Sequence, residues 1–140
     1  MSLLVRHASH EHQGWLVAYD DTVSNEWIQH CIDLRYYLVA ERDQQPLGFL
    51  RFSWFWGKIP YMDMIYVEPA HRRSGIGKEL LSSFQNRTAV RKARCLMTSC
   101  EDGEDEPLHW HKRNGFEVVG DIAIPTFQTA REIFLIKRLA

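Results

Sequence analysis

The stretch Arg72-Arg73-Ser74-Gly75-Ile76-Gly77 decides the fold, because of the segments on either side of it. Before it, residues 61–67 form an apolar, β-favouring segment that stops at Glu68-Pro69 and predicts a buried strand. After it, residues 78–84 carry apolar residues at helical spacing. A strand, a basic loop and a helix, in that order, place backbone N–H groups at a helix N-terminus. The sequence therefore predicts a site for a phosphate-bearing ligand.

The residue types of this loop suit phosphate. Gly75 and Gly77 have no Cβ, so the backbone can come close to a ligand. Arg72 and Arg73 add charge and planar groups of donors that match phosphate oxygens. The residues expected to hold the ligand here are Arg72, Arg73, Ser74, Gly75, Ile76, Gly77 and Lys78.

The spacing separates three kinds of phosphate loop. A dinucleotide-binding loop needs a third glycine where Leu80 stands. A P-loop needs glycine at Arg72 and serine or threonine at Glu79. The remaining pattern, Arg-x-x-Gly-x-Gly after Val67-Glu68-Pro69, resembles the acetyl-CoA loop of the GNAT superfamily of N-acetyltransferases. The plain alternative is a basic turn before a surface helix.

Later segments carry the same resemblance. Residues 95–100 predict a short buried strand, and residues 108–116 predict a short helix that Asn114-Gly115 would cap. GNAT proteins have a Leu/Phe-Tyr-x-Lys-x-Gly-Phe pattern after their second cofactor-binding strand, and Trp110, His111, Arg113, Gly115 and Phe116 fall on it. Residues 117–121 and 132–137 resemble the closing hairpin of the family. The likeness covers most of the chain after about Gln44.

The predicted elements run strand, two helices, three strands, helix, strand, helix, two strands. Ser24 is a plausible N-cap for the second helix. Residues 54–60 are expected to link the third strand to the central one. With the resemblance, this order implies an α/β (α+β) fold. It would be a single GNAT-like domain over residues 1–140, with a mixed, mostly antiparallel sheet of about seven strands and helices on both faces.

Composition agrees with one compact domain. A chain of 140 residues can bury roughly two-thirds of its unfolded surface. The net charge of −1 argues against a nucleic-acid partner. No apolar run is long enough to span a bilayer, and the start lacks a secretion signal, so no membrane partner and a cytoplasmic location are expected. Three cysteines, Cys31, Cys95 and Cys100, are expected as reduced thiols.

The resemblance implies transfer of an acetyl group from acetyl-CoA to a primary amine of a small molecule. The amine must first lose a proton, because an ammonium has no lone pair and an alkylamine has a pKa near ~10.4. Asp63 is the candidate base, acting through water, since a carboxylate in so apolar a strand is costly to bury without a partner or a purpose. The alternative is an ion pair with a residue such as Arg51, or exposure near the start of the strand.

Side-chain alternation places Tyr61, Asp63, Ile65 and Val67 on one face of the central strand. GNAT proteins splay this strand from its neighbour. The resemblance alone therefore implies that backbone groups near Ile65 and Val67 bind the pantetheine arm and that one N–H faces the thioester carbonyl.

His111 stands where GNAT proteins commonly have a tyrosine that can protonate the departing sulfur. An imidazolium can do the same, best at mildly acid pH, because its ordinary pKa is ~6.5. The alternative is that His111 only packs beneath the cofactor and that water protonates the sulfur.

The acceptor pocket is expected to include Tyr36, Trp54 and Trp56, although such aromatic residues also fill the cores of small domains. No metal is expected, because His10 and His12, like His109 and His111, are two residues apart and share no helical face. A relay through Cys100 is a minor variant, and a homodimer is left open. The rival function is a non-catalytic acyl-CoA-binding sensor or interaction module, which would need neither Asp63 nor His111.

Overall fold

The computed structural model describes residues 2–87 and 89–139. Within them, the strands are β1 (Leu4–His7), β2 (Tyr37–Arg42), β3 (Gln45–Phe55), β4 (Ile59–Val67), β5 (Cys95–Glu101), β6 (Glu117–Ile122) and β7 (Glu132–Arg138). The helices are α1 (Gln13–Tyr19), α2 (Asn25–Asp33), α3 (Ile76–Gln85) and α4 (Asp105–Arg113), with short 3-10 turns η1 (His10–His12) and η2 (Pro69–His71). The predicted domain, residues 1–140, also includes Met1, Thr88 and Ala140, which lie outside the described residues.

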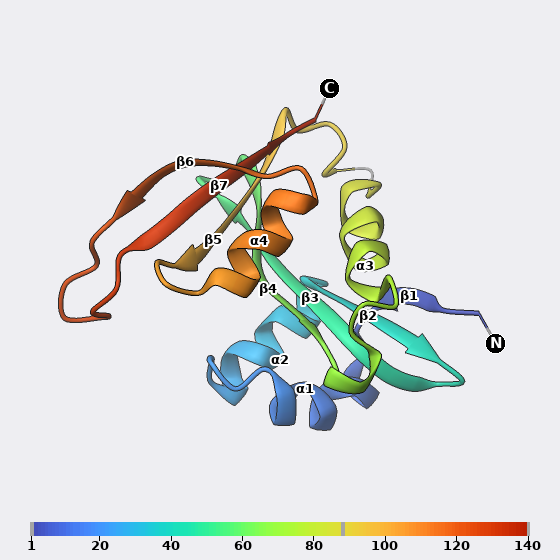
Figure 1. The fold of residues 1–140 in the computed structure, drawn as a ribbon. Helices are drawn as coiled ribbons and strands as arrows, with labels where there is room; N and C mark the ends of the chain where they lie inside the picture. The colour runs from blue at the N-terminus through green and yellow to red at the C-terminus, as the bar shows by residue number, and fades with distance from the viewer. Residues whose placement is uncertain (1, 88, 140) are drawn as a thin grey trace. The chain divides into compact units, whose positions relative to one another are not determined.

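The strands hydrogen-bond in the order β1-β2-β3-β4-β5-β7-β6 (Figure 1). Strand β4 runs parallel to β5. The pairs β1–β2, β2–β3, β5–β7 and β6–β7 are antiparallel. The prediction of a mixed, mostly antiparallel sheet of about seven strands is confirmed, as is the predicted order of the elements.

The predicted link over residues 54–60 was wrong in its extent. Trp54 and Phe55 belong to β3, and β4 already begins at Ile59. Only a tight turn separates the strands, and Trp56 and Gly57 in it have φ angles of 57° and 66°. Helix α4 also begins three residues earlier than predicted, at Asp105. Pro107 does not prevent this start, because the N–H that proline lacks has no intrahelical partner in a first turn.

The chain divides into two compact units. Unit 1 consists of residues 1–52 and 64–87, and unit 2 consists of residues 53–63 and 88–140. Strands β3 and β4 contribute residues to both.

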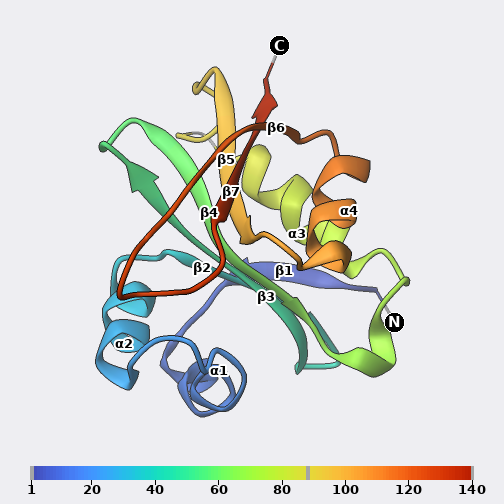
Figure 2. The ribbon, with the colours of Figure 1, turned by 60° about the vertical axis from the view of Figure 1, so that its left-hand side comes forward.

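In unit 1, helices cover both faces of the strands (Figure 2). Leu16 of α1 and Ile28 of α2 belong to a buried cluster with Val39 and Phe49, which alternate on one face of β2 and β3. The side chain of Phe52 lies on the face of β3 opposite to those of Phe49 and Arg51. The centre of its ring lies 4.8 Å from the centre of the Phe84 ring in α3. Ser24 caps α2 as predicted, accepting a hydrogen bond from Trp27 N at 3.1 Å.

A buried polar group connects the end of α1 to the strands. Asp20 has no exposed surface and accepts hydrogen bonds from Arg51 Nε at 2.7 Å and from the Tyr37 hydroxyl. These bonds satisfy a carboxylate that would otherwise be costly to bury. Burial, followed by the hydrogen bond to Asp20, raises the pKa of Tyr37 above its usual range.

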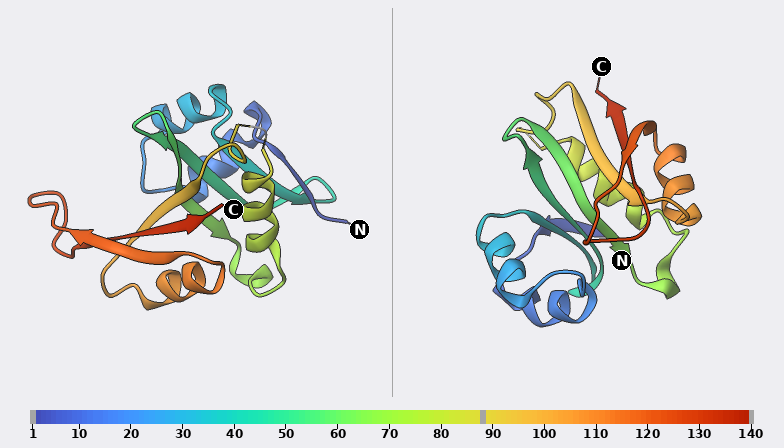
Figure 3. Two further views of the ribbon diagram at one scale, coloured as in Figure 1. Left: turned by 90° about the horizontal axis from the view of Figure 1, so that it is seen from above. Right: turned by 90° about the vertical axis from the view of Figure 1, so that its left-hand side faces the viewer.

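In unit 2, β5 and β6 flank β7, and Figure 3 shows β6 and β7 running side by side. β4 joins β5 through the pairs Tyr61–Met97 and Met62–Thr98. The Thr98 hydroxyl also donates to Met62 O at 2.9 Å. Gly115, with φ of 96°, ends α4 as predicted, so that Phe116 N donates to His111 O at 3.0 Å.

Candidate active site

The loop between β4 and α3 has the backbone geometry of an anion cradle. Gly75 precedes α3 with φ of 87°, in the left-handed region that glycine adopts readily. The bond from Glu79 N to Gly75 O, 3.0 Å long, is an early bond of this helix, so the amides of Ile76, Gly77 and Lys78 come before it. A Cβ at Gly75 would have no atom within 4 Å, so the space above the loop is open. The Ile76 side chain is buried, which leaves only its backbone to bind a ligand.

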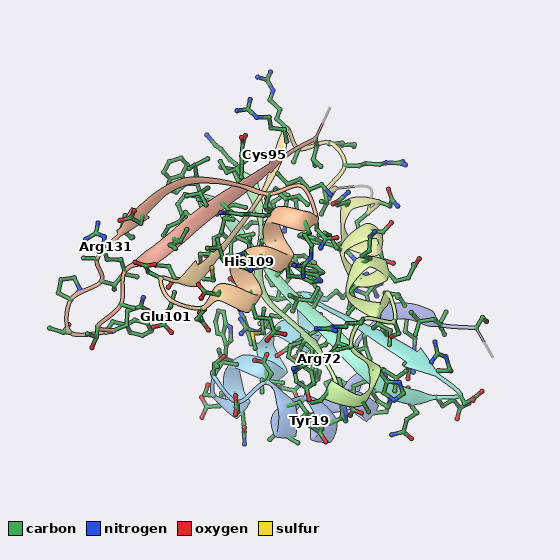
Figure 4. The ribbon with its side chains drawn as sticks, viewed as in Figure 1. Tyr19, Arg72, Cys95, Glu101, His109 and Arg131 are labelled. Carbon is green, nitrogen blue, oxygen red and sulfur yellow. The ribbon has the colours of Figure 1, made fainter. Side chains whose placement is uncertain are left out.

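The basic residues of the loop differ in how they are held. Arg72 donates from Nε to the Val67 carbonyl at 2.9 Å, and its guanidinium lies 6.0 Å from the Tyr66 ring centre. Figure 4 shows Arg72 in this loop. Arg73 is exposed and has φ of 64°. The Ser74 hydroxyl donates to His71 O, so it fixes the turn itself.

Hydrogen bonds of Glu68 fix the end of β4 where the loop begins. Glu68 N donates to Leu47 O at 2.9 Å, and the Trp15 indole donates to the Glu68 carboxylate at 3.3 Å. Met64 and Tyr66 pack against the core of unit 1. By alternation, Ile65 and Val67 have their side chains on the opposite face, and both are half-buried.

Asp63 lies in unit 2, on the same face of β4 as Tyr61, and is half-buried. Burial raises the pKa of Tyr61 to about 12, and the negative charges of Asp63 and Glu132 act in the same direction. Tyr61 therefore keeps its proton at neutral pH, close to the negative charge of Asp63.

His111 is 5% exposed and lies in α4 of unit 2. Its ring meets the rings of Trp110 and Phe116 edge to face, with centres 5.6 Å apart in both pairs. Its Nδ1 is buried and has no hydrogen-bond partner among the described residues. Burial lowers the pKa of His111 to about 4, so the imidazole is neutral at pH 7.

The three aromatic residues expected in an acceptor pocket do not come from one unit. Tyr36 lies in unit 1, where its ring is 5.3 Å from that of Phe52 and packs against the buried cluster. Trp54 and Trp56 lie in unit 2. Trp56 is 78% exposed and contacts Phe55, at 4.7 Å between ring centres.

One group of polar residues in unit 2 was not predicted as a site. The Tyr61 hydroxyl bonds to the Ser99 hydroxyl, and Ser99 donates to Glu132 at 2.6 Å. Gln128 donates to the other oxygen of Glu132 at 2.9 Å. The only signal in the sequence was the position of Tyr61 on the face of Asp63. The pairing of β5 with β7 brings the other residues to it.

The model of the acetyltransferase (GNAT) domain matches residues 33–118. The chain belongs to the GNAT acetyltransferases. No curated protein sequence is similar enough to count as a relative. Family membership supports acyl transfer from acetyl-CoA as the activity.

Solved structures agree in fold. A GNAT acetyltransferase from Bacillus cereus is 21% identical, with a TM-score of 0.81 over 100% of this chain and 99% of that chain. The ribosomal-protein-alanine N-acetyltransferase from Brucella melitensis is 25% identical, with a TM-score of 0.79 over 97% and 99%. The protein yncA from Salmonella typhimurium, solved with its cofactor acetyl-CoA, is 17% identical, with a TM-score of 0.81 over 100% and 95%.

Among the described residues, no group of three or more His, Cys, Asp or Glu side chains is arranged to hold a metal ion. In the same part of the chain, no helix has both the length and the apolar character needed to cross a membrane.

Proposed function

We propose that this protein transfers an acetyl group from acetyl-CoA to a primary amine of a small molecule by direct attack. The observation that carries the proposal is the loop at Gly75, where helix amides, open space and basic side chains come together. A helix N-terminus favours an anion by roughly 0.3–1 kcal/mol at an exposed site.

The residues of the loop fit the diphosphate of coenzyme A. The amides of Ile76, Gly77 and Lys78 would hold the phosphate oxygens, and Arg73 and Lys78 are exposed cations beside them. Arg72 is engaged with Val67 O through Nε only, which leaves its other nitrogens for phosphate in this proposal. Bound acetyl-CoA supplies the thioester carbonyl that the amine attacks.

In this proposal Asp63 takes the proton of the amine through water. Its place within β4, two residues before Ile65, supports this role, because Ile65 and Val67 are the residues whose backbone would bind the pantetheine arm. A backbone N–H there would stabilise the negative charge that develops on the carbonyl oxygen. An ion pair of Asp63 with Arg51 is still the alternative.

His111 is the candidate acid for the departing sulfur. Its pKa of about 4 restricts that role to acid pH, because the protonated fraction falls about tenfold for each pH unit above the pKa. Its contacts with Trp110 and Phe116 support the packing role at neutral pH.

Tyr36, Trp54 and Trp56 are the proposed acceptor residues, and the exposure of Trp56 supports contact with a substrate. The relative from Brucella melitensis is named for acetylation of an alanine of ribosomal protein, so a peptide N-terminus belongs among the acceptors to be tested. A cytoplasmic location is part of the proposal, and it agrees with the finding that Cys31, Cys95 and Cys100 are in no disulfide. The alternative function is an acyl-CoA sensor or interaction module.

The test has two steps. Calorimetry should detect acetyl-CoA binding to the wild-type protein, and a thiol-release assay should then detect turnover with a member of an amine panel. The panel contains spermidine, amino acids, an aminoglycoside, a lysine-rich peptide and a peptide with N-terminal alanine.

Asp63→Asn should lower turnover on the order of 10²–10⁴-fold without weakening acetyl-CoA binding. Unchanged pH–rate behaviour in that variant would remove the base assignment. Binding without turnover on the whole panel would favour the sensor.

A further inference from the structure

A chain of hydrogen bonds crosses three strands of unit 2 and has no role in the proposed function. Tyr61 on β4 bonds to Ser99 on β5, and Ser99 bonds to Glu132, where β7 begins. Gln128 holds Glu132 from the other side, with its amide 2.9 Å from Oε1. Figure 4 labels Glu101, the last residue of β5, and Arg131, which directly precedes Glu132 at the start of β7. All three members of the chain are half-buried.

The chemistry of the groups fixes the direction of these bonds. A carboxylate only accepts, so the Ser99 hydroxyl gives its single proton to Glu132 Oε2, 2.6 Å away. Toward Tyr61, the Ser99 oxygen can then only accept, so the Tyr61 hydroxyl donates to it. The Tyr61 oxygen therefore still has lone-pair capacity to accept a hydrogen bond from an N–H donor.

We infer that this chain is a proton relay, in which Tyr61 and Ser99 pass the proton of the acceptor amine to Glu132. The inference rests on the proposed function, because it concerns how the amine of that reaction is deprotonated. It is an alternative to transfer through water to Asp63, which needs neither Ser99 nor Glu132. Asp63→Asn separates the two routes, because that variant should keep kcat if the relay carries the proton and lose it if Asp63 does.

The transfer balances without any further reactant. The N–H bond of the ammonium breaks and its proton moves to the Tyr61 oxygen. At the same time, the Tyr61 proton moves to Ser99, and the Ser99 proton moves to Glu132. The amine keeps its lone pair for the attack, and Glu132 becomes a neutral carboxylic acid. Glu132 then releases its proton to water, and the two hydroxyls turn back to their first orientation.

The charges around the chain suit a concerted transfer. Tyr61 has a pKa raised by burial to about 12, so it does not act as a base by losing its own proton first. Other titratable groups near Tyr61 and Glu132 include Asp63 on β4, Cys100 and Glu101 on β5, and Asp102 and Glu104 just after β5. Burial and nearby carboxylates, Glu132 among them, raise the pKa of Cys100. Arg131 is occupied by Asp121. Glu132 is therefore the carboxylate at the end of the chain.

A purely structural role of these bonds predicts different effects of substitution. If the bonds only fixed three strands to one another, their loss would lower stability and would affect every acceptor amine equally. A relay acts on amines that arrive protonated. An alkylamine with a pKa near ~10.4 needs it at pH 8, whereas an α-amino group with a pKa near ~8 is partly neutral there.

The experiment compares wild-type protein with Tyr61→Phe, Ser99→Ala and Glu132→Gln. Substrates are the lysine side chain of an N-acetylated peptide and the α-amine of an alanine peptide, both at saturating acetyl-CoA. Each variant should lose kcat on the order of 10²-fold with the lysine side chain, at the lower end of what a general base supplies. The loss should be several-fold smaller with the α-amine, and the affinity for acetyl-CoA should not change.

Further measurements separate a relay from structure. Glu132→Asp and Ser99→Thr keep the carboxylate and the hydroxyl, and they should recover part of kcat. Tyr61→Phe combined with Glu132→Gln should cost no more than either change alone, because residues that act as a unit are not additive. For the wild-type protein, a plot of kcat against the fraction of D₂O in the solvent should be curved, because several protons move in one step. For Ser99→Ala the same plot should be linear. ¹³C NMR of the Glu132 carboxyl should respond when the amine is added to the protein with bound coenzyme A.

Glu101→Gln is the matched control, since it removes a carboxylate in register with Glu132 on the neighbouring strand. It should leave kcat unchanged. Equal losses for both amines, or variants that keep wild-type kcat, would overturn the relay and leave the proposed function standing. Absence of acetyl-CoA binding and turnover in the wild-type protein would overturn both.

Discussion

The ring of His111 lies between Trp110 and Phe116, and burial gives it a pKa of about 4. The tyrosine that commonly stands at this position would carry its proton at every physiological pH. Replacing it with a buried imidazole therefore keeps the shape of a flat ring and moves its proton-donating form to acid solution.

This residue allows a pH-resolved prediction. If His111 donates a proton to the departing sulfur, His111→Phe should lower the single-turnover rate more at pH 5 than at pH 8, because the imidazolium fraction is larger at pH 5. His111→Tyr should raise the rate at pH 8 above that of the wild-type protein, because the phenol still carries its proton there. Rapid-mixing measurements at both pH values check this. Equal effects of His111→Phe at the two values would assign the residue to packing alone.

Single residues also mark the limit of what the sequence reveals about the site. The loop residues are adjacent in the chain, so their pattern could be read directly. Tyr61, Ser99 and Glu132 come from three strands, and nothing in the local sequence says that β5 pairs with β7 in the register that places Ser99 opposite Phe134. Only the structure shows the register of that pairing.

At the scale of elements, the loop between β4 and α3 depends on the left-handed backbone at Gly75. A left-handed conformation costs most residues roughly 1–2 kcal/mol. Gly75→Val should therefore lower stability by about that amount and also abolish acetyl-CoA binding, because the new side chain would occupy the open space above the loop. Arg73→Ala should weaken acetyl-CoA binding without abolishing it, by about 1.5–3 kcal/mol if a charge-assisted bond is lost.

Gly103 offers the matched control for this prediction. It has φ of 101°, and a Cβ there would also have no atom within 4 Å. Gly103→Val should cost similar stability in thermal unfolding yet leave the calorimetric affinity for acetyl-CoA intact. Normal coenzyme binding by Gly75→Val would place the diphosphate elsewhere.

Elements were predictable in kind and order but not in their ends. Alternation and helical spacing identify β4 and α3, since each buries one face. The ends of β3 and β4 depend on Trp56, which adopts a left-handed φ of 57° that its residue type does not favour. The turn was therefore hidden within a run of aromatic residues.

For the whole molecule, two histidines with lowered pKa values couple stability to pH. Burial lowers the pKa of His7 in unit 1 and of His111 in unit 2 to about 4. The unfolded chain, with ordinary values near ~6.5, binds more protons between these limits. The contribution of these two histidines to the free energy of unfolding is therefore complete above pH ~6.5, and it is lost as the pH drops toward 4.

Urea titrations at pH 7.5 and pH 4.5 should show this decrease. His111→Phe should make it smaller, by up to about 2.5 kcal/mol over this pH range if the full shift applies. His109→Gln removes an exposed histidine from the same helix and should leave the decrease as it is in the wild-type protein. A decrease of equal size in all three proteins would contradict the coupling.

Strand β6 is the last strand in the hydrogen-bonding order, and Val118, Val119 and Ile122 on it are each about half exposed. Such a border offers unused peptide groups to any other extended chain. The irregular register between Val118 and Gly120 disturbs that template, and Glu117 and Asp121 keep charges along it through Arg138 and Arg131. Loss of these two ion pairs would weaken this protection against intermolecular β-pairing.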